Sequence, residues 1–116
     1  MTTADDTART RLEELRSVTL QRLSALRGEH DAVVDASRDS NADDEHDPEG
    51  ATIAFERAQV DALVRDALAR LESVDDALRR IDDGTYGICT VCGDRIAPGR
   101  LEVRPTATTC VACATG

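Results

Sequence analysis

The four cysteines of this 116-residue chain are the feature that most constrains its fold. They form two C-x-x-C pairs separated by seventeen residues, which is the spacing of a tetrahedral Cys₄ zinc site. Gly93 directly follows the first pair, where a residue that can take a positive φ lets backbone N–H groups turn toward the sulfurs. The sequence therefore predicts one zinc ion, and its predicted ligands are Cys89, Cys92, Cys110 and Cys113.

Two other states of the cysteines remain open: a pair of disulfides, as in a small secreted module, and an iron–sulfur cluster. The first residues include Asp5 and Asp6, whereas a signal peptide needs a basic start followed by an apolar run. No segment approaches the length of a transmembrane span. We therefore expect a cytoplasmic protein without a membrane anchor, in which reduced thiols hold a metal.

The predicted zinc is structural and not catalytic. Four cysteines close the coordination shell, whereas a catalytic zinc keeps one position open. Residues 84–116 contain no His and no Glu that could act as a base except Glu102, which falls in what reads as a short strand. This segment has few apolar side chains, so we expect metal binding to supply most of its folding free energy. Because a two-helix hairpin also offers no concave pocket for a substrate, we do not expect an enzyme.

Two long helices are predicted before the cysteines. In the second, apolar residues alternate in steps of four and three, which is an a/d heptad seam over three heptads. The seam residues are Val60, Val64, Ala67, Leu71, Val74, Leu78 and Ile81, and Leu63 and Leu68 widen the stripe. The first helix carries a less regular stripe of Leu12, Leu15, Val18, Leu23, Leu26, Val33 and Val34, on which His30 also falls.

A short breaker separates these two helices. Pro48 and Gly50 predict an interruption of both periodicities over residues 38–50. A heptad seam needs a partner, and the economical one is the first helix of the same chain, which gives an antiparallel hairpin in a monomer. Gly84 is a natural residue to follow the C-cap of the second helix.

The predicted fold is therefore mostly α, with a long antiparallel two-helix coiled-coil hairpin and a small C-terminal Cys₄ zinc finger. Residues 1–83 form the hairpin, with an acidic tip at about 39–50, and residues 84–116 form the finger.

Charge restricts the partners. A net charge of −9 opposes direct binding to DNA, because nucleic-acid affinity depends on neutralising phosphates. The acids are concentrated between the two helices, at Asp39, Asp43, Asp44, Glu45, Asp47 and Glu49. They either form a solvated turn or meet an external counterpart, which would be a divalent cation such as Mg²⁺ or an Arg-rich surface. His46 is a further possible ligand there.

Three segments resemble the C-terminal zinc finger of the DksA/TraR proteins: Tyr86-Gly-Ile-Cys-Thr-Val-Cys-Gly93, Arg100-Leu-Glu-Val-Arg-Pro-Thr-Ala107 and Cys110-Val-Ala-Cys113. This combination is far more specific than the cysteines alone, and the preceding hairpin matches in architecture. The resemblance implies a bacterial transcription regulator that binds RNA polymerase and not DNA. Its coiled coil is expected to enter the secondary channel of the polymerase and to alter promoter open complexes, often together with the alarmone ppGpp.

The resemblance also implies roles for individual residues. The family's tip is Asp-x-x-Asp-x-Ala, and here Asp44 and Asp47 supply the paired acids. Counting back from the cysteines instead places Glu49 and Ala51 over the second acid and the alanine. Arg104 matches one of the basic residues that bind ppGpp or polymerase in such proteins.

Two other functions remain open. One is a Gre-like factor whose tip carboxylates hold a second Mg²⁺ and stimulate transcript cleavage by the polymerase. The other is a protein–protein adaptor stabilised by zinc.

Overall fold

The computed structural model describes the backbone of residues 4–40 and 48–114, and the side chains of residues 4–28 and 51–114. Four helices follow one another in these residues: α1 (Ala4–Ser40), α2 (Pro48–Asp83), α3 (Pro98–Val103) and α4 (Val111–Ala114). The chain divides into two compact units, one of residues 1–18 and 71–116 and the other of residues 19–70. Among the described residues, no helix is long and apolar enough to cross a membrane.

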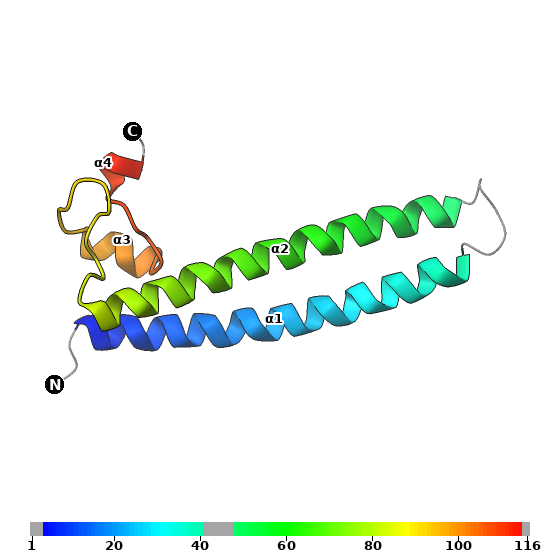
Figure 1. Ribbon diagram of the computed structural model, residues 1–116, viewed down its shortest axis with the longest axis horizontal. Helices are drawn as coiled ribbons and strands as arrows, with labels where there is room; N and C mark the ends of the chain where they lie inside the picture. Colours follow the sequence, from blue (N-terminus) through cyan, green and yellow to red (C-terminus); the bar gives the residue numbers. More distant parts are fainter. Residues whose placement is uncertain (1–3, 41–47, 115–116) are drawn as a thin grey trace. The chain divides into compact units, whose positions relative to one another are not determined.

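In the first unit, α1 and α2 lie side by side and run in opposite directions (Figure 1). Arg9 pairs with Asp82 at 2.6 Å, and Arg16 pairs with Asp75 at 2.8 Å, which defines an antiparallel register. These pairs are largely exposed, so solvent screens the charges and the pairs contribute little to stability. Burial contributes more: the core consists of Leu12, Val74 and Ala77, with Leu15, Leu78, Ile81 and Tyr86 packed against it.

The second unit has its own core between α1 and α2. Leu23, Leu26 and Ala67 are buried, and the partly buried Leu63 and Val64 pack against them. Together the two cores confirm the prediction of a mostly helical chain with two long antiparallel helices. The predicted seam of α2 is confirmed as well, since its described members are all buried or half-buried.

The stripes on both helices are narrower than predicted. Val18 is 60% exposed and Leu68 is 41% exposed, so neither belongs to a core. Thr19 is buried in place of Val18, with only 3% of its surface exposed. It stands seven residues after Leu12 and seven before Leu26, so the heptad spacing of α1 and not hydrophobicity places it inward.

The interruption between the two long helices is shorter than predicted. α1 extends to Ser40 and α2 begins at Pro48, so Pro48 and Gly50 do not break a helix. A proline is tolerated in the first turn because the N–H it lacks would have no partner inside the helix. Residues 41–47 lie outside the described part of the chain.

Gly84 ends α2, as predicted. Its φ of +77° is the left-handed conformation that glycine adopts without steric cost. The N–H of Gly84 donates to the carbonyl of Ile81 at 3.2 Å, and the N–H of Thr85 donates to that of Arg80 at 2.9 Å. These two bonds form a Schellman motif, which satisfies the last carbonyls of the helix and turns the chain into the finger.

The finger contains no strand among its described residues, only an isolated antiparallel bridge between Ile88 and Arg95. The prediction of a strand around Glu102 is therefore wrong, because Glu102 lies in α3. Pro98 explains the difference, since its fixed φ suits the first turn of a helix.

Candidate metal centre

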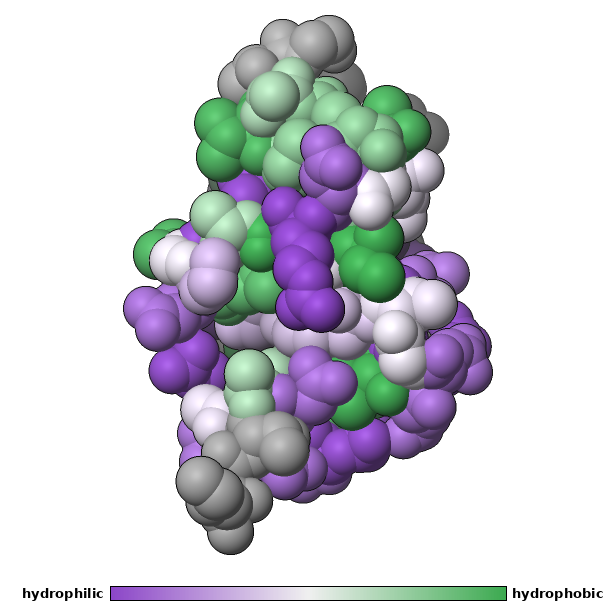
Figure 2. Space-filling view, turned by 90° about the vertical axis from the view of Figure 1, so that its left-hand side faces the viewer, coloured by the Kyte–Doolittle hydropathy of each residue, from purple (hydrophilic) through white to green (hydrophobic). Residues whose placement is uncertain are grey.

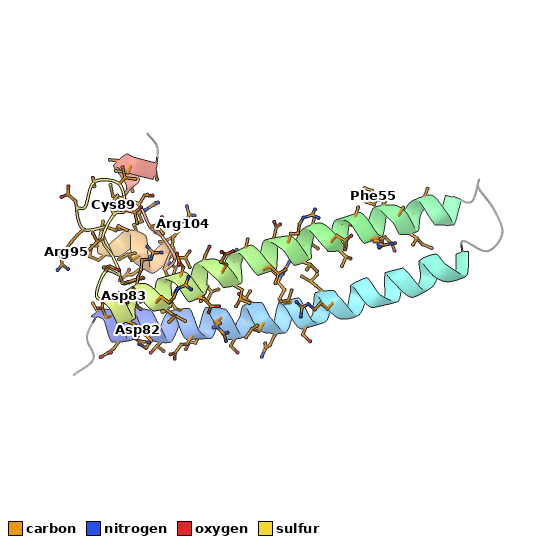
Figure 3. All side chains as sticks on the ribbon, in the orientation of Figure 1. Phe55, Asp82, Asp83, Cys89, Arg95 and Arg104 are labelled. Atoms are coloured by element: carbon orange, nitrogen blue, oxygen red, sulfur yellow. The ribbon has the colours of Figure 1, made fainter. Side chains whose placement is uncertain are left out.

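The first cysteine pair lies in a tight turn that closes on itself. The N–H of Cys89 donates to the carbonyl of Asp94 at 2.8 Å, and the N–H of Gly93 donates to the carbonyl of Cys89 at 3.0 Å. Gly93 has a φ of +77°, as its position after the pair predicted. Cys89 is buried inside the finger (Figure 3), whereas Cys92 is exposed.

The second pair flanks the start of α4, where the N–H of Ala114 donates to the carbonyl of Cys110 at 2.9 Å. Two contacts hold the chain just before it. The N–H of Thr90, from the first pair, donates to the carbonyl of Thr108 at 2.9 Å. The Nε of Arg100, from α3, donates to the carbonyl of Thr109 at 2.8 Å.

These contacts bring all four sulfurs within 4.8 Å of one another. The Sγ atoms of Cys92 and Cys110 are 3.8 Å apart, too far for a disulfide bond. A zinc–sulfur bond of about 2.3 Å in a tetrahedron gives a sulfur–sulfur edge of about 3.8 Å. Four free cysteines at this spacing are the donor set that a structural zinc ion requires.

The surroundings shift the pKa values of Cys89 and Cys113 in opposite directions. The backbone N–H of Cys92, followed by that of Cys110, lowers the pKa of Cys89 to about 6. The thiols of Cys110 and Cys89 raise the pKa of Cys113 to about 12, because neighbouring sulfurs cannot all ionise together. A bound cation offsets the repulsion between the thiolates, so all four can lose their protons. Metal binding and proton release are therefore coupled.

Tyr86 joins the finger to the end of the helix pair. Its side chain packs against the Leu12, Val74 and Ala77 core, and its hydroxyl donates to the carbonyl of Pro105 at 2.8 Å. Burial raises the pKa of the Tyr86 hydroxyl, which therefore stays protonated as a donor. The sequence showed this tyrosine only as part of a motif, because a bond across nineteen residues depends on the finished fold.

Comparison with known proteins agrees with this geometry. Residues 84–116 match the family described as the prokaryotic dksA/traR C4-type zinc finger. The finger is therefore of the DksA/TraR type. The family match of the finger and its four clustered cysteines together support one structural zinc ion, as the sequence predicted.

The similarity extends into the helices. The protein is 33% identical to the RNA polymerase-binding transcription factor DksA of Escherichia coli over 91 residues, which is 78% of this chain and 60% of that protein. It is 42% identical to the uncharacterized protein YteA of Bacillus subtilis over 69 residues, which is 60% of this chain and 29% of that protein. The chain thus spans between 29% and 60% of the length of these two curated relatives.

A solved structure is similar over nearly the whole chain. The transcription factor DksA2 from Pseudomonas aeruginosa matches with a TM-score of 0.78 and 29% sequence identity. The match covers 96% of this chain and 80% of that one. This chain and DksA2 therefore have the same fold, which includes both the helix pair and the finger.

The other predicted site residues lie apart from the cysteines. Arg104 is exposed at the end of α3, and Figure 3 places it on the other side of that helix from Arg95. Ala51 is exposed in α2. Asp44 and Asp47 lie outside the described residues, as does the side chain of Glu49, so their tip role stays a prediction.

The fold has a concave pocket that the argument from a two-helix hairpin alone did not predict, because finger residues form part of its wall. A cavity of about 360 Å³ lies in the first unit, between the start of α1 and the finger. Figure 2 views this end of the molecule and shows apolar residues gathered on the finger in its upper half. No cysteine, histidine or serine lines the cavity, whose described walls include Asp5, Arg11, Tyr86, Arg95, Ile96 and Leu101.

Proposed function

We propose that this protein is a cytoplasmic transcription regulator that binds RNA polymerase as a monomer and does not bind DNA directly. The observation that carries the proposal is the structural likeness to DksA2 over 96% of the chain, together with the finger match. The relative from Escherichia coli is itself described as RNA polymerase-binding. The net charge of −9 also favours a protein partner with basic surfaces over a polyanion.

In this proposal the two parts of the chain have different tasks. Residues 1–83 form a helical arm that enters the secondary channel of the polymerase, and residues 84–116 form a finger that the zinc ion stabilises. The acidic stretch at about 39–50 approaches the catalytic Mg²⁺, where Asp44, Asp47, Glu49 and Ala51 act. These residues modulate open complexes by contacting one polymerase state better than another.

Arg104 is the proposed contact for ppGpp or for the polymerase surface. Its guanidinium is exposed and always charged, which suits a phosphate or carboxylate partner. An Arg104→Ala variant should therefore lose any response to added ppGpp while it keeps its zinc.

The decisive experiment separates binding from regulation. The unmodified chain should copurify with core RNA polymerase and change the lifetime of open complexes on a short-lived promoter. The variant D44N/D47N/E49Q should lose the lifetime effect, while its affinity for polymerase stays within about tenfold, or ~1.4 kcal/mol. The variant E13Q/E14Q/D66N removes the same charge from exposed helix positions and should keep both properties.

Other outcomes would redirect the assignment. Absence of copurification with polymerase would favour the adaptor function. Loss of binding and activity together in the tip variant would make the acids an affinity element. Stimulated transcript cleavage in stalled complexes would favour the Gre-like function.

A further inference from the structure

The two cysteine pairs come from separate segments, and hydrogen bonds within the finger connect these segments. The second pair follows the residues Thr108 and Thr109, whose carbonyl groups both accept hydrogen bonds from elsewhere in the finger. One donor is the backbone N–H of Thr90, between the cysteines of the first pair. The other is a side chain, the guanidinium of Arg100, whose Nε lies 2.8 Å from the carbonyl oxygen of Thr109.

Arg100 can hold the second cysteine pair in place relative to the first, because the segment before α3 is hydrogen-bonded to the segment before Cys89. The N–H of Ile96 donates to the carbonyl of Gly87 at 2.7 Å, and Ile96 is buried. The bridge between Ile88 and Arg95 fixes the same two segments side by side. α3 starts directly after these contacts, so its Arg100 side chain links the first pair to the residue before Cys110.

Its surroundings distinguish Arg100 from the other finger arginines. The side chain is half-buried, whereas Arg95 and Arg104 are exposed. A zinc ion with four thiolates carries a net charge of −2, and a cation held beside such a centre stabilises it more strongly when water is partly excluded. A guanidinium also keeps its charge and its donors at any accessible pH.

We propose that Arg100 is a positioning residue for the zinc site. It holds the carbonyl of Thr109, and through it the second cysteine pair, in the arrangement that the metal requires. Its guanidinium is hydrogen-bonded to the residue directly before Cys110. This role concerns the metal alone and holds whether or not the protein binds polymerase.

The test compares zinc affinity in matched variants. Arg100→Met keeps the length of the side chain but removes the charge and the donor, and it should weaken zinc binding by about ten- to a hundredfold in competition with a chromophoric chelator. Arg95→Met makes the same change at an exposed position of the finger and should stay within about twofold of the unmodified protein. Arg100→Lys retains charge and a flexible donor, so its affinity should fall between those of the unmodified protein and Arg100→Met.

Cobalt(II) provides a spectroscopic readout that separates positioning from folding. At excess cobalt, Arg100→Met should regain the intense d–d bands of tetrahedral thiolate coordination, because all four ligands are still present. The proposal fails if Arg100→Met binds zinc as tightly as the unmodified protein, if Arg95→Met is weakened equally, or if Arg100→Lys is no better than Arg100→Met. It also fails if excess cobalt does not restore the tetrahedral spectrum, since Arg100 would then be needed for folding itself.

Discussion

The hydroxyl of Tyr86 donates a hydrogen bond to the carbonyl oxygen of Pro105, 2.8 Å away, while its ring packs against the core between α1 and α2. A single side chain thus contacts both the finger and the end of the helix pair. Because the bond is half-buried, it contributes more to stability than an exposed one would. A carbonyl that loses its donor there is poorly hydrated.

Replacing Tyr86 by Phe should therefore lower the free energy of unfolding by about 1 kcal/mol. The ring stays in place, so the change isolates the hydroxyl. Denaturant unfolding of the zinc-loaded protein measures the effect, with Val103→Ala as an exposed control in the finger. Equal stability of Tyr86→Phe and the unmodified protein would mean that water replaces the bond at no cost.

Removal of zinc should unfold the finger and leave much of the helix pair intact. The Leu23, Leu26 and Ala67 core contains no finger residue, so it does not depend on the metal. Elemental analysis should give one zinc per chain before chelation, and circular dichroism should show that most helical signal survives afterwards. Complete loss of helix on chelation would show that the second unit depends on the first.

Zinc affinity should rise steeply with pH. The pKa of Cys113 is raised to about 12 and that of Cys92 is also raised, so both thiols are protonated near neutral pH in the absence of metal. Zinc must displace these protons, and two displaced protons strengthen binding by roughly a hundredfold per pH unit. Chelator competition between pH 6 and 8 measures the slope, and a flat profile would show that the thiols are already ionised.

The helix pair should tolerate a change outside its core far better than one inside it. Leu12 is fully buried, so Leu12→Ala should cost about 2–5 kcal/mol. Leu20→Ala makes the same substitution on the same helix, at a residue that is 38% exposed, and should cost about 1 kcal/mol or less. Thermal unfolding measures both effects. Similar losses of stability in the two variants would show that the interface between α1 and α2 lies elsewhere.

Two glycines should respond with opposite signs. Gly84→Ala should destabilise by about 1–2 kcal/mol, because an L-residue is strained at a φ of +77°. Gly99→Ala should stabilise by about 0.5–1 kcal/mol, since Gly99 lies in α3 without a positive φ and an added Cβ meets nothing within 4 Å. Denaturant midpoints of the two variants should shift in opposite directions.

Local pattern was enough to predict much of this fold. The spacing of the cysteines predicted the clustered sulfurs, and the heptads of α2 predicted its buried residues except Ala77. Errors arose where a local rule has two outcomes. Pro48 reads as a helix breaker, yet it begins α2. The segment around Glu102 reads as a short strand, yet it lies in α3, which Pro98 begins.

Features that depend on tertiary contacts could not be predicted from the sequence. The bond from Arg100 to Thr109 spans nine residues, and that from Tyr86 to Pro105 spans nineteen. No periodicity or motif specifies such a partner, because a side chain finds a backbone carbonyl only after both segments are placed. The cavity beside the first turns of α1 has the same origin.

The Schellman motif at Gly84 has a consequence for recombination between relatives. Only Gly84 and Thr85 separate the last residue of α2 from Tyr86, which is already part of the helical core. The finger therefore cannot be exchanged as a cassette cut at residue 83 unless the incoming tyrosine fits the recipient's helices. A functional chimera has to carry the finger together with the ends of α1 and α2, so these three segments should be inherited as one block.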